Sequence, residues 1–185
     1  MMKLTIKIAL VLLVLAVAAL GVSYQLPKQC VAEKSIVVKA KPDQVYMYLE
    51  NPTEWIRWSA WNKAYDPTMI QLYGGPMRGS GARLTWNGDR IGSKQMVFTE
   101  SQGPSQLLYE VTYSNQLHKT TGSFELEETK NGTLVRWREQ TELNNSPVDL
   151  VKGAWQRYRT DIEMEQGLLG LKTLVLQNSK RRATR

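Results

Sequence analysis

Six strand-like segments, separated by turn signals, occupy the middle of this chain and restrict the folds that it can adopt. They cover residues 69–73, 82–86, 94–101, 106–113, 120–128 and 133–143. Glycine, proline and asparagine mark the breaks between them, as in Gly74-Gly75-Pro76 and Asn131-Gly132. Because such short connections join antiparallel neighbours, the segments predict an antiparallel sheet.

Alternation along these segments gives the predicted sheet one apolar face. The positions that it selects are Leu84, Trp86, Met96, Phe98, Tyr109, Val111, Tyr113, Phe124, Leu126, Val135 and Trp137. The opposite positions include Arg83, Glu125 and Arg138, which predict a solvated outer surface. One face of the sheet is therefore expected to pack against the rest of the chain.

A strand and two short helices are predicted before these segments. Residues 33–39 have strand composition, and Pro42 suits the first position of a helix. Three of the six tryptophans follow, at Trp55, Trp58 and Trp61. Their spacing of three places them near one face of a helical turn, where large apolar rings need burial.

A long helix is predicted after the sheet, with Ser146 as its N-cap and Pro147 at its first position. Its apolar stripe is predicted at Val151, Trp155, Tyr158 and Ile162, and Leu168, Leu171 and Val175 continue a neighbouring stripe. Gly167 and Gly170 each cost a helix about 1 kcal/mol relative to alanine. A bend or a close contact with the sheet is expected at these glycines.

The net charge of +7 is confined to the two ends of the chain. Residues 31–178 hold equal numbers of basic and acidic side chains, and the excess comes from Lys3, Lys7, Lys28, Lys180, Arg181, Arg182 and Arg185. Binding to a nucleic-acid backbone requires a basic face on the folded domain, so a nucleic-acid partner is not expected. Basic ends beside an apolar segment suit an anionic membrane surface, although the last residues also fit a solvated tail.

An uncharged apolar run at residues 8–22 predicts a membrane-inserted segment. Extended to residues 4–24, it is long enough to span the hydrocarbon core if Lys7 reaches the interface. A cleavable signal peptide is the alternative, with Ala16-Val17-Ala18 as its cleavage site. We favour an uncleaved single-pass anchor because the run continues to Val22 without a polar residue. The short basic N-terminus before it favours a domain on the extracytoplasmic side.

Metal and disulfide chemistry are not expected. Cys30 is the only cysteine, so it has no intramolecular partner, and His118 is the only histidine. We interpret His118 as a residue of a polar hairpin loop. No serine, cysteine or lysine has a recognisable activating partner in the sequence, and no cofactor motif is present.

Several motifs resemble the SRPBCC superfamily, the START-like group often labelled polyketide cyclase/dehydrase. They are WIRWSAW at 55–61, Asp66-Pro67, YGGP at 73–76, GSGARLTWNG at 79–88, SKQMVFTES at 93–101 and EMEQGLLGLKTLV at 163–175. One departure is Ala60, where the family commonly has proline. The resemblance implies an α+β helix-grip fold, in which a curved antiparallel sheet wraps around a long C-terminal helix and encloses a hydrophobic cavity.

The same resemblance implies an apolar small molecule or lipid as the partner, bound by aromatic positions on the strands and the last helix. The candidate ligand-contacting residues are Trp58, Trp61, Trp86, Met96, Phe98, Tyr109, Tyr113, Trp137, Glu139, Trp155 and Tyr158. The tryptophans also fit a filled core, which is the commoner fate of internal tryptophan.

Glu139 is the one weak candidate for a catalytic residue. It shares strand parity with Val135 and Trp137, so it is expected to point inward, where a carboxylate can orient a ligand hydroxyl or act as a general base. The plainer interpretation, which we favour, is that Glu139 meets solvent or an arginine.

The prediction is therefore a START-like domain at residues 31–178, preceded by an anchor and linker at residues 1–30 and followed by a basic tail at residues 179–185. Its predicted function is hydrophobic ligand binding. The alternatives are a cyclase, dehydratase or hydrolase using Glu139 or a tyrosine, and a protein-interaction module that uses the outer face of the sheet.

Overall fold

The computed structural model describes residues 29–114, 119–143 and 146–183, and of the first 28 residues only 6, 7, 10, 11, 13, 14, 18 and 21. Side chains 147, 150, 151, 182 and 183 are outside the description. His118 and most of the predicted anchor, residues 4–24, also lie outside the described residues. Within the described part of the chain, no helix combines the length and the apolar character needed to cross a membrane.

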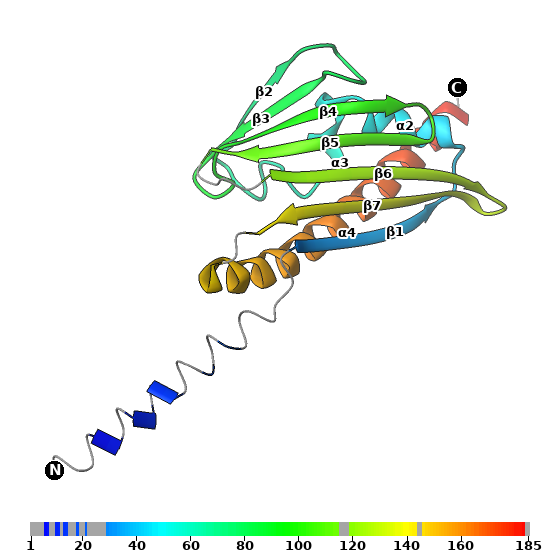
Figure 1. Ribbon diagram of the computed structural model, residues 1–185. Helices are drawn as coiled ribbons and strands as arrows, with labels where there is room; N and C mark the ends of the chain where they lie inside the picture. Colours follow the sequence, from blue (N-terminus) through cyan, green and yellow to red (C-terminus); the bar gives the residue numbers. More distant parts are fainter. Residues whose placement is uncertain are drawn as a thin grey trace.

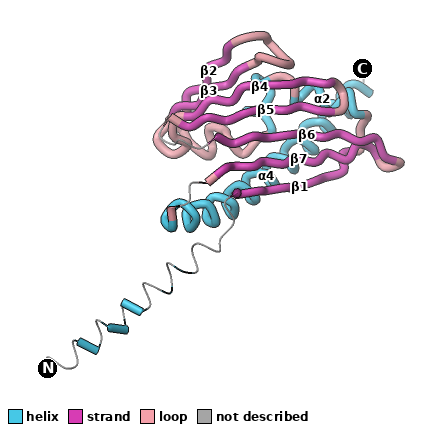
Figure 2. Tube along the Cα trace, in the orientation of Figure 1, coloured by secondary structure: helices cyan, strands magenta, loops and turns pink. Residues whose placement is uncertain are grey.

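The described residues form a seven-stranded antiparallel sheet and the helices that cover one of its faces (Figure 1). The elements are β1 (Gln29–Val38), α2 (Pro42–Leu49), η1 (Pro52–Glu54), α3 (Trp55–Trp58), β2 (Ile70–Gly74), β3 (Arg83–Asn87), β4 (Lys94–Gln102), β5 (Gln106–Tyr113), β6 (Lys119–Thr129), β7 (Gly132–Glu142) and α4 (Pro147–Ala183). The strand order is β1-β7-β6-β5-β4-β3-β2. Figure 2 shows the strands as one continuous layer with the helices behind it. This arrangement confirms the predicted helix-grip fold.

The tryptophans of α3 fill the space inside the curved sheet. Trp55 is fully buried, and its ring centroid lies 5.6 Å from Tyr109 and 5.8 Å from Phe124. Its indole nitrogen donates to the Leu49 carbonyl at 2.8 Å, and that of Trp58 donates to the Tyr48 carbonyl at 3.0 Å. Because these bonds satisfy the polar atoms of both rings, the two tryptophans can be buried, and α3 packs against the inner face of the sheet.

Two glycines let α4 pack closely against the rest of the fold. A Cβ at Gly167 would lie 2.9 Å from the Trp137 ring of β7, and one at Gly170 would overlap the backbone carbonyl of Trp58 in α3. Of the two explanations that the sequence offered for these glycines, close contact is therefore correct. Gly167 faces the sheet and Gly170 faces α3.

The predicted buried stripe is wrong for the first half of α4. Trp155 is 64% exposed, Tyr158 58% and Ile162 40%. The buried positions in this half are Gly153 and Met164, which lie on the opposite side of the helix. The reason is that the side of the helix with Gly153 has no side chain there to separate it from Leu143, whereas the side with Trp155 and Tyr158 carries two bulky rings. The helix also continues beyond the predicted end at Gln177 to Ala183.

Candidate ligand-binding site

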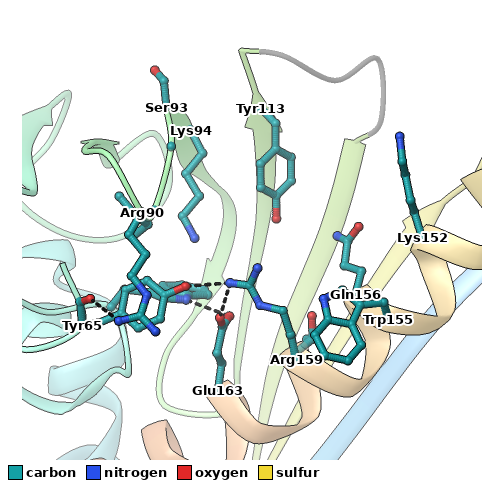
Figure 3. Close-up of a pocket in the computed structure, with 14 residues that line it drawn as sticks. Tyr65, Arg90, Ser93, Lys94, Tyr113, Lys152, Trp155, Gln156, Arg159 and Glu163 are labelled. Carbon is teal, nitrogen blue, oxygen red and sulfur yellow. Dashed lines mark hydrogen bonds and ion pairs between the residues drawn. The ribbon is translucent and has the colours of Figure 1, made fainter.

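A cavity of about 340 Å³ opens between the end of the sheet and the first half of α4 (Figure 3). Its lining comes from the segment after α3, the β3–β4 connection, β4, β5 and α4. The lining residues are Trp61, Tyr65, Arg90, Ile91, Gly92, Ser93, Lys94, Tyr113, Lys152, Trp155, Gln156, Arg159, Thr160 and Glu163. The volume lies within the range of known small-molecule pockets.

Lys94 is a buried cation at the inner wall of this cavity. It is 6% exposed, and its Nζ lies 3.8 Å from the ring centroid of Trp61 and 5.0 Å from that of Trp86. Within the described part of the chain, no hydrogen bond or ion pair joins this ammonium to another residue. Indole faces attract a cation, but they leave its three N–H donors without acceptors.

Strand geometry explains why a lysine is buried here. Lys94 begins β4 and shares its inward face with Met96 and Phe98, so alternation turns the amine toward the helices. Its register partner on β5 is Tyr113, and in Figure 3 the two polar tips point into the same space. Burial lowers the pKa of Lys94 to about 8, against the opposing effect of the Glu163 and Glu139 carboxylates.

Glu163 and Arg159 of α4 form the opposite wall. The Glu163 carboxylate accepts the Trp61 indole N–H at 3.0 Å and pairs with the Arg159 guanidinium at 3.3 Å. Arg159 also donates to the Tyr65 hydroxyl at 2.6 Å. These bonds connect α4 to the segment after α3 and fix the orientation of the Trp61 ring beside Lys94.

Asp66 holds the β3–β4 connection against the segment after α3. Its carboxylate accepts the backbone N–H groups of Arg90 and Ile91, each at 2.9 Å, and the Thr68 hydroxyl at 2.6 Å. These donors, the Thr68 hydroxyl foremost, lower the pKa of Asp66 to about 2. The Arg90 guanidinium then lies 4.7 Å from the centroid of the Tyr65 ring at the rim of the cavity.

Glu139 lies deeper in the fold, in a buried hydrogen-bonded row. Its carboxylate accepts the Tyr109 hydroxyl at 2.5 Å, and that hydroxyl accepts the Trp137 indole N–H at 2.6 Å. Burial raises the pKa of Glu139, while the Tyr109 bond and the Lys94 charge oppose the change. Glu139 therefore points inward as alternation predicts, and the favoured alternative, contact with solvent or an arginine, is wrong.

The structure divides the predicted site residues into three groups. Trp61, Tyr113 and Trp155 line the cavity. Tyr158 lies on the exposed side of α4. The others are buried behind the cavity in the aromatic core, and they are Trp58, Trp86, Met96, Phe98, Tyr109, Trp137 and Glu139.

Sequence reasoning missed most of the polar lining. Lys94 shares strand parity with Met96 and Phe98, so the alternation that selected those residues also indicated an inward lysine. No comparable signal exists for Arg159 and Tyr65, because their contact joins residues 94 positions apart. The polar wall depends on tertiary structure that spacing along the chain does not reveal.

The fold and cavity define a helix-grip protein of the START-like class. Residues 29–176 match the family described as polyketide cyclase / dehydrase and lipid transport. The chain therefore belongs to this family. Comparison with curated proteins gives no match.

Solved structures with the same fold share little sequence with this chain. SA2116 from Staphylococcus aureus, a protein of unknown function, is 11% identical with a TM-score of 0.63, and the alignment covers 82% of this chain and 96% of that one. The di-domain ARO/CYC StfQ of the steffimycin biosynthetic pathway is 13% identical with a TM-score of 0.62, over 82% of this chain and 52% of StfQ. The di-domain ARO/CYC BexL of the BE-7585A biosynthetic pathway is 14% identical with a TM-score of 0.60, over 79% and 50%. This chain thus spans about half the length of both di-domain proteins.

Proposed function

We propose that the cavity binds a small amphipathic acid. Its apolar body packs on Trp61 and Trp155, and its anionic oxygen accepts hydrogen bonds from Lys94. The observation that carries this proposal is the Lys94 ammonium, which lines the cavity beside the Trp61 and Trp86 rings and has no hydrogen bond or ion pair among the described residues. A buried charge without a partner is unfavourable, so an anionic oxygen beside it replaces lost hydration with charge-assisted hydrogen bonds.

The charge of the cavity lining supports an acidic ligand. Four cations, Arg90, Lys94, Lys152 and Arg159, face one carboxylate, Glu163, and that carboxylate is already paired with Arg159. A ligand anion therefore meets a positive potential along the lining. Family membership supports the same class of ligand, because acidic lipids and phenolic polyketides both combine an apolar body with an ionisable oxygen.

We further propose that residues 4–24 anchor this domain to a membrane as a single span, with the domain on the extracytoplasmic side. The apolar run and its basic flanks support this placement. An anchored binding domain would exchange its ligand with the lipid phase near which it is held.

Ligand affinity in a matched pair of variants tests the proposal. The probes are the anionic dye 1-anilinonaphthalene-8-sulfonate and its neutral analogue N-phenyl-1-naphthylamine. Lys94→Met should lower the affinity for the anionic probe by roughly tenfold, which corresponds to about 1.4 kcal/mol of binding free energy. The affinity for the neutral probe should stay unchanged. The control is Lys130→Met, an exposed lysine in the β6–β7 turn. If Lys94→Met binds each probe with the same affinity as the unaltered protein does, this amine has no role in ligand binding.

A second candidate function is a cyclase or dehydratase that uses Glu139 as an acid or base. The raised pKa of this buried carboxyl group and its contact with Tyr109 favour the candidate. Glu139→Gln separates the two functions. It should abolish turnover of a polyketide-type substrate by an enzyme, whereas a carrier should retain its affinity for the sulfonate probe.

A further inference from the structure

An exposed apolar face runs along the first half of α4, beside the mouth of the cavity. It consists of Val148, Trp155, Tyr158 and Ile162, all exposed. Val148, Trp155 and Ile162 follow one another at intervals of seven residues. Each interval turns the side-chain direction by only about 20° around the helix axis, so the three lie on one side of α4. The Trp155 and Tyr158 rings lie 5.8 Å apart and form the widest part of this face.

This exposed apolar face borders the opening of the proposed ligand site. Trp155 belongs to both, since it is mostly exposed and also lines the cavity. Lys152 and Arg159 line the cavity from the same helix, about one turn before and one turn after Trp155. Any surface that covered the aromatic pair would therefore also lie against the cavity mouth and its cations.

The N-terminal segment joins the domain beside this half of α4. β1 begins at Gln29, and the charges of Arg157 and Asp161 both act on the thiol of the next residue, Cys30, whose pKa is raised mainly by burial. Figure 1 shows the start of β1 next to the first turns of α4. The predicted membrane span ends at residue 24, which leaves residues 25–28 as the connection. Because extended chain covers about 3.3–3.6 Å per residue, the connection holds this part of the domain within roughly 20 Å of the bilayer.

We infer that the exposed apolar face of α4 docks on an anionic lipid bilayer, so that the cavity mouth opens directly onto the membrane. Tryptophan and tyrosine favour the headgroup region, where an apolar ring meets a polar boundary. Lys152 and Arg159, which border this face, would then lie near lipid phosphates, each adding about 1 kcal/mol near an anionic surface. The inference rests on the proposed anchor and explains how an amphipathic acid would pass between the bilayer and Lys94.

Site-specific labelling of the full chain in vesicles tests this docking. In a Cys30→Ala background, Tyr158→Cys carries an environment-sensitive nitrobenzoxadiazole label on the proposed docking face. The matched control is Glu125→Cys, an exposed position on the outer face of β6. Vesicles contain phosphatidylglycerol and a brominated phosphatidylcholine, which quenches fluorophores that reach the acyl region. The label at position 158 should shift to the blue and be quenched, whereas the label at position 125 should do neither.

Three outcomes would overturn the inference. If the protein floats with the vesicles but neither label is quenched, the anchor stands and the docking is wrong. If the protein does not float with the vesicles, both the anchor and the docking are wrong. If the Tyr158→Cys variant, left unlabelled, instead forms disulfide-linked dimers that depend on protein concentration, a second copy of the chain covers this face. None of these outcomes changes the probe affinities of Lys94→Met, so failure of the docking remains distinct from failure of the ligand site.

Discussion

Tyr109, Gly122 and Glu139 form a row across three neighbouring strands, and the glycine makes the row possible. Gly122 on β6 is in register with Tyr109 on β5 and with Glu139 on β7. The tyrosine ring lies over the glycine, in the space that a side chain would fill, and so reaches the carboxylate on the strand beyond. A residue without a side chain thus connects a tyrosine and a buried glutamate that are two strands apart.

Gly122→Ala should therefore destabilise the fold. The new Cβ would overlap the Tyr109 ring, which has to move and lose its hydrogen bond to Glu139. Overpacking of this kind lowers the free energy of unfolding by about 1–3 kcal/mol. Urea denaturation measures the loss. The control is Gly74→Ala on edge strand β2, where a Cβ meets no atom within 4 Å. Equal midpoints for the two variants would contradict this account.

At the scale of elements, α4 is one helix with two environments. Its second half packs against α3 and the sheet through Gly167, Gly170 and Leu171, whereas its first half borders the cavity and exposes Trp155. Alanine favours a helix over glycine by about 1 kcal/mol, so only close contact can make a glycine-to-alanine change unfavourable in this element.

Two glycines of α4 should consequently respond in opposite directions to alanine. At Gly170 the Cβ would meet the Trp58 backbone, which cannot move aside, and the free energy of unfolding should fall by about 1–3 kcal/mol. At Gly153 the nearest atoms are the flexible tips of Leu143, so helix propensity should prevail and raise stability by up to about 1 kcal/mol. Thermal unfolding of both variants checks the signs. If Gly170→Ala stabilised the protein, α4 would not pack so closely against the Trp58 backbone of α3.

The connection between β3 and β4 depends on Asp66. Because the folded-state pKa of this carboxyl group is lowered from 3.8 to about 2, its stabilising effect is complete above about pH 4 and is lost as the pH falls through 2. Asp66→Asn places an amide opposite the N–H donors of Arg90 and Ile91. The variant should be less stable than the unaltered protein at pH 7, and the difference should narrow between about pH 4 and pH 2.

Urea midpoints across this pH range provide the measurement, with Asp89→Asn as the control. Asp89 is an exposed carboxylate in the same turn, and its removal changes the net charge equally. The urea midpoints of Asp66→Asn and the unaltered protein could instead differ by the same amount from pH 7 to pH 2. The effect of the substitution would then come from side-chain shape and not from the loss of charge.

Across the whole molecule, the sequence predicts the sheet far better than the site. Strand alternation located β5 at Gln106–Tyr113 without error and the other strands within a few residues, because marked turns separate the strands and every strand except the edge strand β2 has one buried face. The cavity depends instead on where α4 lies relative to the β3–β4 connection. Periodicity identifies the apolar stripe of Trp155, Tyr158 and Ile162 but does not show whether that stripe faces the sheet or solvent, so the burial predicted for these residues was wrong.

The same limit applies to Lys94. Strand parity with Met96 indicates an inward side chain, but a lysine at the first residue of a strand ordinarily reaches solvent by extending along its stem. Its burial follows from Trp61 and Trp86, which close over it from other segments. The sequence shows the parity of Lys94 but not the two rings that bury it, so pattern alone assigns this lysine to the surface.

Lys94→Met should raise stability at neutral pH while weakening the anionic probe. The folded protein holds the Lys94 pKa near 8 rather than 10.5, so below pH 8 a buried ammonium opposes folding, and this opposition disappears as the pH rises from 8 to 10.5. The variant should gain about 1–3 kcal/mol at pH 7, after allowance for the lost cation–π contacts, and the gain should shrink toward pH 10. Urea denaturation at the two pH values, with Lys130→Met as the control, measures it. A gain of the same size at both pH values would place its origin in packing, and a loss at pH 7 would mean that the indole rings stabilise the ammonium by more than its burial costs.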